Sequence, residues 1–288
     1  MTQGYITLGV DQPGKVDNIE AAAILAMTAR MADPDREFAV AVRSHGDVPS
    51  RLENAFDYII ELPFKRTDPN EENQLIDTWQ IYYATPFDET VWINPRSLVI
   101  DNLATIWEGT EHVDMLFGNS VTYRGDNAQY RTKLHPLMKN NLPTVTADVF
   151  YFGDNNDSAE FFKMADPVFR NWRDIYRQYI KEHRPNMFDF TVLVNIVTHM
   201  IGIEVHDHRF GFEYIDFNPD NMPIDLDEES TADWSEQINI WFYKGQHVKV
   251  NNHRQKGIWV YHDDDILTKE VKHDIRINFS QDTTTSAA

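Results

Sequence analysis

The chain has 288 residues, 42% of them hydrophobic and 12% aromatic, which allows a large core and excludes a disordered chain. Its 26 Lys and Arg residues against 46 Asp and Glu residues leave a net charge of −20, so non-specific nucleic-acid binding is not expected. The lack of cysteine excludes disulfides, thiolate metal sites and a cysteine nucleophile, and it fits a cytoplasmic protein. No window approaches the roughly 18 apolar residues that cross a membrane, so we expect no membrane span.

The first third of the chain alternates short apolar runs with segments rich in helix-forming residues. The apolar runs, which are typical of buried strands, are residues 5–10, 38–42 and 58–62. The segments with helical spacing are residues 19–31, 50–56 and 74–83. Because strands that alternate with helices usually pair in parallel, this pattern predicts a doubly wound α/β sheet.

Residues 85–108 hold the most informative pattern in the sequence. A polar turn leads into the apolar run 91–93, the triplet Asn94-Pro95-Arg96 interrupts it, and a second short apolar run and an amphipathic segment follow. Ligands of open α/β sheets bind beyond the carboxyl ends of the strands. The triplet is therefore predicted to lie at the ligand-binding edge of the sheet.

Beyond residue 118 the pattern is less regular. The predicted elements are a strand at 145–152, helices at 157–180 and 189–200, strand character at 209–217 and a strand pair around Gly257 within 249–262. Pro167 is a candidate break in the first of these helices, and the Ser-, Thr- and Ala-rich residues 280–288 are predicted to be a disordered tail. No Gly/Ser linker divides the chain, so we expect one continuous domain.

This order of elements, with the interrupted strand at Asn94 and a later helix at Asp189, resembles the GT-A glycosyltransferases. It is most similar to small members from phages and bacteria, including those that decorate glycans or modified DNA bases. The resemblance implies a Rossmann-like, mostly parallel twisted sheet with flanking helices and a C-terminal acceptor-side lobe. Residues 1–118 would bind a nucleotide-sugar donor, with UDP favoured, and residues 119–279 would form the acceptor-side half of the same domain. The activity implied is transfer of the sugar to a hydroxyl group.

The chain departs from this family at the triplet itself. In GT-A enzymes an Asp-any-Asp triplet at this place holds a divalent metal on the donor diphosphate, whereas Asn94 is at best a neutral oxygen ligand and Arg96 repels a cation. Arg96 could instead form a bidentate pair with the diphosphate, which would allow transfer without a metal. Alternatively, Pro95 only shapes a loop and the site has decayed. A requirement for Mn²⁺ or Mg²⁺ stays open.

Further donor-side candidates lie near the two ends of the chain. Thr7, Gly9 and Asp11 could line a pocket for the base or ribose, although an ordinary turn between a strand and a helix has the same pattern. Lys256 and His262 resemble the closing segment of the family, in which basic groups reach the donor phosphates or the metal. A hairpin with a solvated basic turn is the alternative for these two residues.

Two carboxylates are candidates for catalysis. Asp148 interrupts an apolar strand, and because an unpaired buried carboxylate is costly, it is either partnered, exposed or directed toward a cleft. In a cleft it could bind an acceptor hydroxyl or act as its base. Asp189 resembles a sugar-side carboxylate of the family but fits a helix N-cap equally well. A ligand- or partner-binding protein on a decayed scaffold, and an unrelated structural α/β protein, are the alternatives to a transferase.

Overall fold

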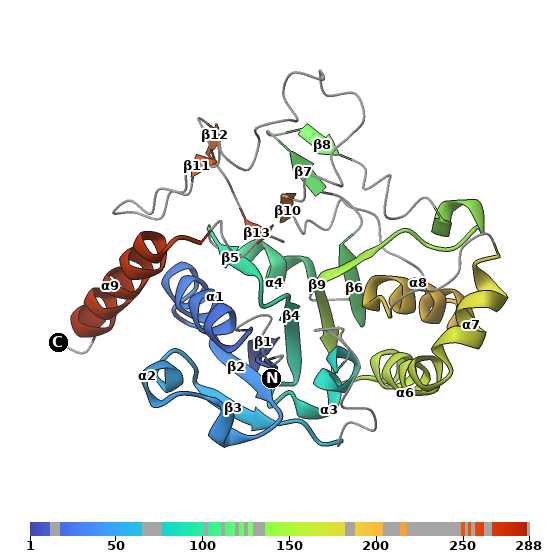
Figure 1. Cartoon of the computed structure of the whole chain (residues 1–288), viewed down its shortest axis with the longest axis horizontal. Coiled ribbons are helices and arrows are strands. Elements are labelled where there is room, and N and C mark those ends of the chain that lie inside the picture. Colours follow the sequence, from blue (N-terminus) through green and yellow to red (C-terminus); the bar gives the residue numbers. More distant parts are fainter. Residues whose placement is uncertain are drawn as a thin grey trace.

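A computed structural model describes residues 1–11, 18–64, 77–100, 103–110, 113–118, 121–123, 126–128, 136–181, 188–203, 214–217, 249–250, 253–254, 257–261 and 267–286 (Figure 1). Its centre is a six-stranded sheet in the order β3-β2-β1-β4-β9-β6. The strands are β1 (Gln3–Leu8), β2 (Glu37–Val42), β3 (Tyr58–Glu61), β4 (Glu89–Ile93), β6 (Met115–Gly118) and β9 (Thr146–Gly153). Strands β1 to β4 are parallel, and β9 runs antiparallel to β4 and β6. The predicted α/β class and mostly parallel sheet are confirmed.

One face of the sheet is covered by α1 (Asn18–Ala32) and α4 (Ala104–Thr110). Helix α9 (Lys269–Ser286) packs on the outer side of α1, as Figure 1 shows in red beside blue. Because α1 lies between the sheet and α9, it is buried on most sides, which explains its Ala-rich and weakly amphipathic sequence. Helix α9 continues to Ser286 and so enters residues 280–288, for which the sequence predicts a disordered tail.

The other face carries α3 (Ile81–Ala84), α6 (Asn156–Arg170) and α8 (Phe190–Ile201), with α7 (Trp172–Tyr179) following α6. Aromatic rings join these helices to the sheet: the Tyr82 ring lies 5.0 Å from Phe162 and 6.0 Å from Phe152, centroid to centroid. The shorter helices are η1 (His45–Asp47), α2 (Ser50–Glu53) and η2 (Thr78–Gln80). The sheet is thus covered by helices on both faces, as the strand–helix alternation predicts.

The long helical segment after β9 breaks at Asn171 and not at Pro167. Pro167 lies inside α6, whereas Asn171 leaves the helical conformation with φ −110° and ψ 27°. The Asn171 side chain donates to the Pro167 carbonyl over 2.9 Å, alongside its own backbone N–H at 3.1 Å. The Asn171 side chain thus adds a second donor to the Pro167 carbonyl in the last turn of α6, and the change in the backbone angles of Asn171 ends the helix.

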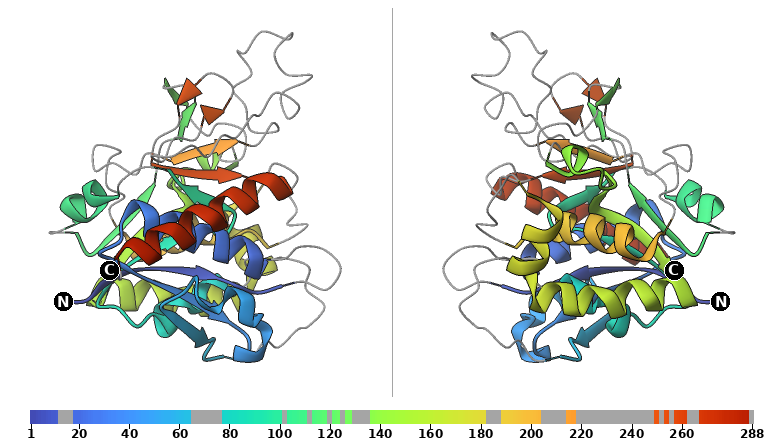
Figure 2. Two further views of the ribbon diagram at one scale, coloured as in Figure 1. Left: turned by 90° about the vertical axis from the view of Figure 1, so that its left-hand side faces the viewer. Right: turned by 90° about the vertical axis from the view of Figure 1, so that its right-hand side faces the viewer.

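A second sheet lies above the central one in the views of Figure 2. Its order is β5-β13-β10-β7-β8, formed by β5 (Ser97–Val99), β7 (Val121–Tyr123), β8 (Asp126–Ala128), β10 (Tyr214–Phe217) and β13 (Ile258–Tyr261). Strand β11 (Lys249–Val250) pairs only with β12 (His253–Arg254) within the described residues. The predicted strand pair around Gly257 is therefore wrong, because β12, before Gly257, pairs with β11, whereas β13, after it, pairs with β5 and β10.

Candidate functional site at the carboxyl edge of the sheet

The carboxyl ends of β1 and β4 lie side by side and are joined through a threonine. Thr7 is fully buried, and its Oγ1 donates to the carbonyl oxygen of Ile93 over 2.7 Å. Ile93 is the last residue of β4, so this bond fixes the start of the triplet relative to β1. The structure therefore gives Thr7 a structural contact, and its predicted role toward a nucleotide stays a prediction.

The turn that follows β1 is tightly packed. The Gly9 N–H donates to the Ala41 carbonyl over 2.8 Å, and a Cβ at Gly9 would lie 2.8 Å from Val40 Cγ2, closer than a carbon side chain tolerates. Asp11 Oδ1 accepts from the N–H of Ile19 over 2.9 Å, at the start of α1. These contacts explain both residues structurally and bring Asp11 beside the α1 N-terminus, where backbone N–H groups favour anions.

Asn94 directly follows β4 and is only 5% exposed. Its backbone N–H donates to the Asp148 carbonyl over 2.7 Å, which continues the pairing of β4 with β9. Its side-chain Nδ2 donates to Asp148 Oδ1 over 2.7 Å, and its Oδ1 accepts from the Arg96 N–H over 3.0 Å. We refer to the side-chain bond between Nδ2 and Oδ1 as the Asn94–Asp148 link. It brings together two residues that the sequence singles out separately.

Asp148 is half-buried on β9, an otherwise buried strand. Of the alternatives that the sequence leaves open, the structure supports a partnered carboxylate. Among the described residues, Asn94 is the hydrogen-bond partner of this carboxylate, and it engages Oδ1. A carboxylate with one oxygen held by an amide has its position fixed and retains acceptor capacity on the other oxygen.

Arg96 is held between the two sheets by its backbone. Its N–H is bound by Asn94, and its carbonyl oxygen accepts from the Tyr261 N–H over 2.9 Å. The Arg96 side chain is partly exposed. Arg96 thus combines a backbone held at both peptide groups with a partly exposed side chain at the carboxyl edge of the sheet.

Asp189 is the N-cap of α8, with its Oδ1 accepting from the Val192 N–H over 3.2 Å. The capping interpretation is therefore confirmed. Burial and the nearby Asp189 carboxylate raise the pKa of the Tyr176 hydroxyl on α7. Asp189 thus lies on the α7 side, and no described contact joins it to the Asn94–Asp148 link.

Asn195, which sequence patterns did not single out, lies in the middle of the apolar helix α8. Its Oδ1 accepts from the Val145 N–H over 2.9 Å, and its Nδ2 donates to the Val145 carbonyl over 2.8 Å. Asn195 is fully buried and so holds the chain where it enters β9, three residues before Asp148. A buried amide in an otherwise apolar helix was the available signal, because such a group needs partners.

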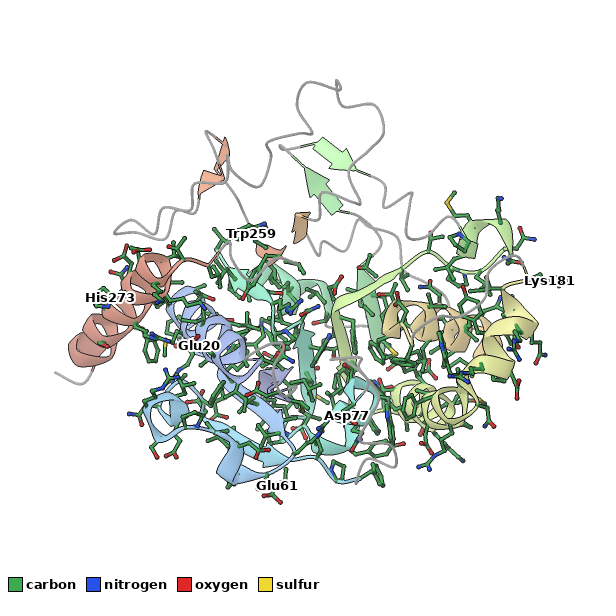
Figure 3. The ribbon with its side chains drawn as sticks, viewed as in Figure 1. Glu20, Glu61, Asp77, Lys181, Trp259 and His273 are labelled. Atoms are coloured by element: carbon green, nitrogen blue, oxygen red, sulfur yellow. The ribbon has the colours of Figure 1, made fainter. Side chains whose placement is uncertain are left out.

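Lys256 and His262 lie outside the described residues. The segment between them, however, borders the triplet: β13 pairs antiparallel with β5, and the Ile100 N–H donates to the Gly257 carbonyl over 2.8 Å. Gly257 has φ 68°, in the left-handed region that favours glycine. Figure 3 labels Trp259 on β13, above α1 and close to β5.

Within the described part of the chain, no cluster of three or more His, Asp or Glu side chains has the arrangement of a metal site. Nor do its helices include one that combines the length and apolar character required to cross a membrane.

Comparison with known proteins identifies the fold. No protein-family model matches the sequence, and no curated protein matches it at a significant level. Among solved structures, the galactosyltransferase LgtC in complex with donor and acceptor sugar analogues superposes with a TM-score of 0.53 at 12% identity, over 96% of this chain and 95% of that one. The glycosyltransferase GlyE of Streptococcus pneumoniae TIGR4 gives 0.50 at 8% identity, over 99% of this chain and 65% of that one. The chain therefore has the fold of the GT-A glycosyltransferases.

Proposed function

We propose that this protein is a glycosyltransferase that moves a sugar from a nucleotide-diphosphate donor, with a UDP-sugar favoured, to a hydroxyl-bearing acceptor. The observation that carries this proposal is the position of the Asn94–Asp148 link and Arg96 at the carboxyl edge of a sheet with the LgtC fold. Polar and charged groups at this edge are where open α/β sheets bind ligands.

On the donor side, the departing diphosphate gathers negative charge as the bond to the sugar breaks. Arg96 supplies a planar cation that can bind two phosphate oxygens at once, and this neutralises the leaving group. Lys256 and His262 are the further phosphate-side groups of the proposal. Gly9 and Asp11, in the turn after β1, and Thr7 beneath it, form the side of the site nearest to the nucleoside.

On the acceptor side, Asp148 is the group we assign to the reacting hydroxyl. Its carboxylate accepts the hydroxyl proton while the hydroxyl oxygen bonds to the anomeric carbon. The bond from that carbon to the diphosphate oxygen breaks, and its electron pair leaves with the nucleotide. Asp189 keeps its sugar-side role only as a prediction, because its carboxylate caps α8.

The net charge of the chain favours one class of acceptor. A glycan hydroxyl and a modified DNA base are both candidates from the resemblance. The net charge of −20 opposes a DNA duplex, since phosphate contacts usually supply most of the affinity for nucleic acid. A neutral glycan is therefore the acceptor we favour.

A thermal-shift panel of UDP, GDP, CMP and their common sugars, each with and without Mn²⁺, tests the proposal. A ligand at about a hundred times its dissociation constant stabilises by roughly 2.7 kcal/mol, which raises Tm by several degrees in a protein of this size. We expect a shift with UDP and a UDP-sugar that is reduced in Arg96→Ala. Arg177→Ala, which removes an exposed arginine on α7, is the matched control for the loss of one positive charge. No shift with any nucleotide would favour a decayed scaffold that binds some other partner.

A further inference from the structure

The position at which GT-A enzymes hold a divalent metal is filled differently in this chain. A cation such as Mn²⁺ or Mg²⁺ needs oxygen ligands with lone pairs directed at it. Asn94 Oδ1 already accepts from the Arg96 N–H, and Asn94 Nδ2, a donor, faces the Asp148 carboxylate at 2.7 Å. Both ends of the Asn94 amide are therefore engaged within the protein, and its neutral oxygen has at most one lone pair left for a cation. The residues at this position do not fit a divalent cation.

The charges near Asn94 also disfavour a divalent cation. Arg96 adds a positive charge two residues after Asn94, in the same turn. Asp148 is the one carboxylate that contacts the triplet among the described residues, and a single carboxylate that faces an amide donor is a weak cation site. The Asn94 amide does for Asp148 what a cation would otherwise do, since it supplies a positively polarised group to the carboxylate.

We propose that Asn94 is the residue that excludes a divalent cation from this site, because the Asn94–Asp148 link occupies the place where a cation would join the two strands. The meaning of this inference for catalysis rests on the proposed function, since it concerns the same site. It makes Asn94 a positioning residue that holds Asp148 and the Arg96 backbone in one arrangement. The wild-type site then binds its nucleotide without a metal.

The link can be inverted by substitution. Asn94→Asp replaces the amide donor by a second carboxylate, so that two negative groups face each other where the hydrogen bond was 2.7 Å long. Like charges at this distance repel strongly, and a divalent cation between them would relieve the repulsion. Adding Asp148→Asn exchanges the two partners. It restores an amide–carboxylate bond in the opposite sense and keeps an oxygen for the Arg96 N–H.

The experiment measures Tm of wild type, Asn94→Asp, Asp148→Asn and the double variant Asn94→Asp/Asp148→Asn, each in EDTA and in saturating Mn²⁺, with no nucleotide. We expect the wild type to be unaffected by Mn²⁺. Asn94→Asp should melt lower in EDTA and rise by roughly 5–10 °C in Mn²⁺. The double variant should recover the wild-type Tm in EDTA and lose the response to Mn²⁺. Asp148→Asn alone should show no response either.

Two results would overturn the inference. One is a wild-type Tm that rises in Mn²⁺ and no longer does so in Asp148→Asn, since the link would then already share a cation. The other is a folded Asn94→Asp protein without a Mn²⁺ response. If Asn94→Asp does not fold, direct Mn²⁺ binding to wild type and Asp148→Asn, measured by calorimetry, gives the same decision. Because no nucleotide is present, failure of this inference and failure of the proposed function are read separately.

Discussion

The two ends of the central strands use their polar side chains in different ways. Toward the amino end, the Tyr5 hydroxyl donates to Asp33 Oδ2 over 2.6 Å and accepts from Trp107 Nε1 over 2.9 Å, in a closed and largely buried network. At the carboxyl end, Asp148 and Arg96 are tied to Asn94 but keep partly exposed side chains. The first arrangement is a buried network that stabilises the fold, whereas the second holds a carboxylate at the partly exposed edge of the sheet.

The largest expected effect is on catalysis at the carboxyl edge. Asp148→Asn should lower kcat for the proposed sugar transfer by about 100-fold or more, because it removes the carboxylate that we propose as the base for the acceptor hydroxyl. Tm should fall by no more than a few degrees, since an amide can still bond to Asn94. Sugar-transfer assays that compare Asp148→Asn with the control variant Asp174→Asn, which changes an exposed acid on α7, measure the loss of kcat. Full activity in Asp148→Asn would remove Asp148 from the mechanism.

Next in size is the effect on nucleotide affinity. Arg96→Ala should weaken UDP binding by about 10- to 100-fold, because a charge-assisted bond to phosphate is lost. Arg96→Lys should recover only part of the affinity, since a lysine lacks the planar fork that binds two oxygens. Calorimetric Kd values for both variants test the point. Equal affinities in wild type and Arg96→Ala would show that Arg96 does not face the diphosphate.

A stability effect is expected at the amino end. Tyr5→Phe leaves the Asp33 carboxylate and the Trp107 indole without their shared partner, which should cost about 1–3 kcal/mol. Burial, together with the bond to Asp33, raises the pKa of Tyr5, so the hydroxyl stays protonated at neutral pH. Denaturant melts measure the loss, while UDP affinity should not change. A loss of affinity in Tyr5→Phe would show that the two ends are coupled.

The smallest expected effect lies between α1 and α9. Glu20, which Figure 3 labels on α1, forms salt bridges with three basic side chains. Its carboxylate oxygens lie 2.5 Å from a nitrogen of Arg276, 3.3 Å from Lys272 Nζ and 3.5 Å from a nitrogen of Arg51. Burial raises the pKa of Glu20, but the bonds and charges of Arg276 and Lys272 outweigh this and lower it below its ordinary value. Glu20→Gln should therefore cost about 0.5–1 kcal/mol at neutral pH.

The pH dependence of this cost has a definite sign. A carboxyl group whose pKa is depressed by folding contributes stability above its unfolded pKa and loses it as the pH falls through its folded pKa. The difference in stability between wild type and Glu20→Gln should thus be constant above about pH 5.5 and should shrink in acid, as the pH falls through the lowered pKa of Glu20. Urea melts at pH 3.5, 5.5 and 7 measure it. A difference that grows in acid would contradict the assignment.

Local patterns were a good guide to this protein where the structure depends on neighbours in sequence. The alternation of apolar runs and helical segments predicted β1, α1 and β2 to within two or three residues. Asp189 was recognised as an N-cap candidate because the capped N–H, that of Val192, is only three residues away. The break at Asn171 was missed, since Pro167 is the stronger local signal although its helix continues past it.

The site was predictable only in its parts. Asn94, Arg96 and Asp148 were each singled out from their local surroundings, but the sequence left Asp148 either partnered, exposed or facing a cleft. Its partner, Asn94, lies 54 positions earlier in the chain. The pairing of β13 with β5, which brings Tyr261 to Arg96, spans a still longer separation.

The sequence by itself determined the α/β class, the net charge and the Asn-Pro-Arg triplet after an apolar run, because these follow from residue type and spacing. The tertiary structure alone decided that β9 enters the sheet antiparallel beside β4 and that its Asp148 meets the Asn94 amide. Strand register and direction are set by packing between distant segments, which no local pattern encodes.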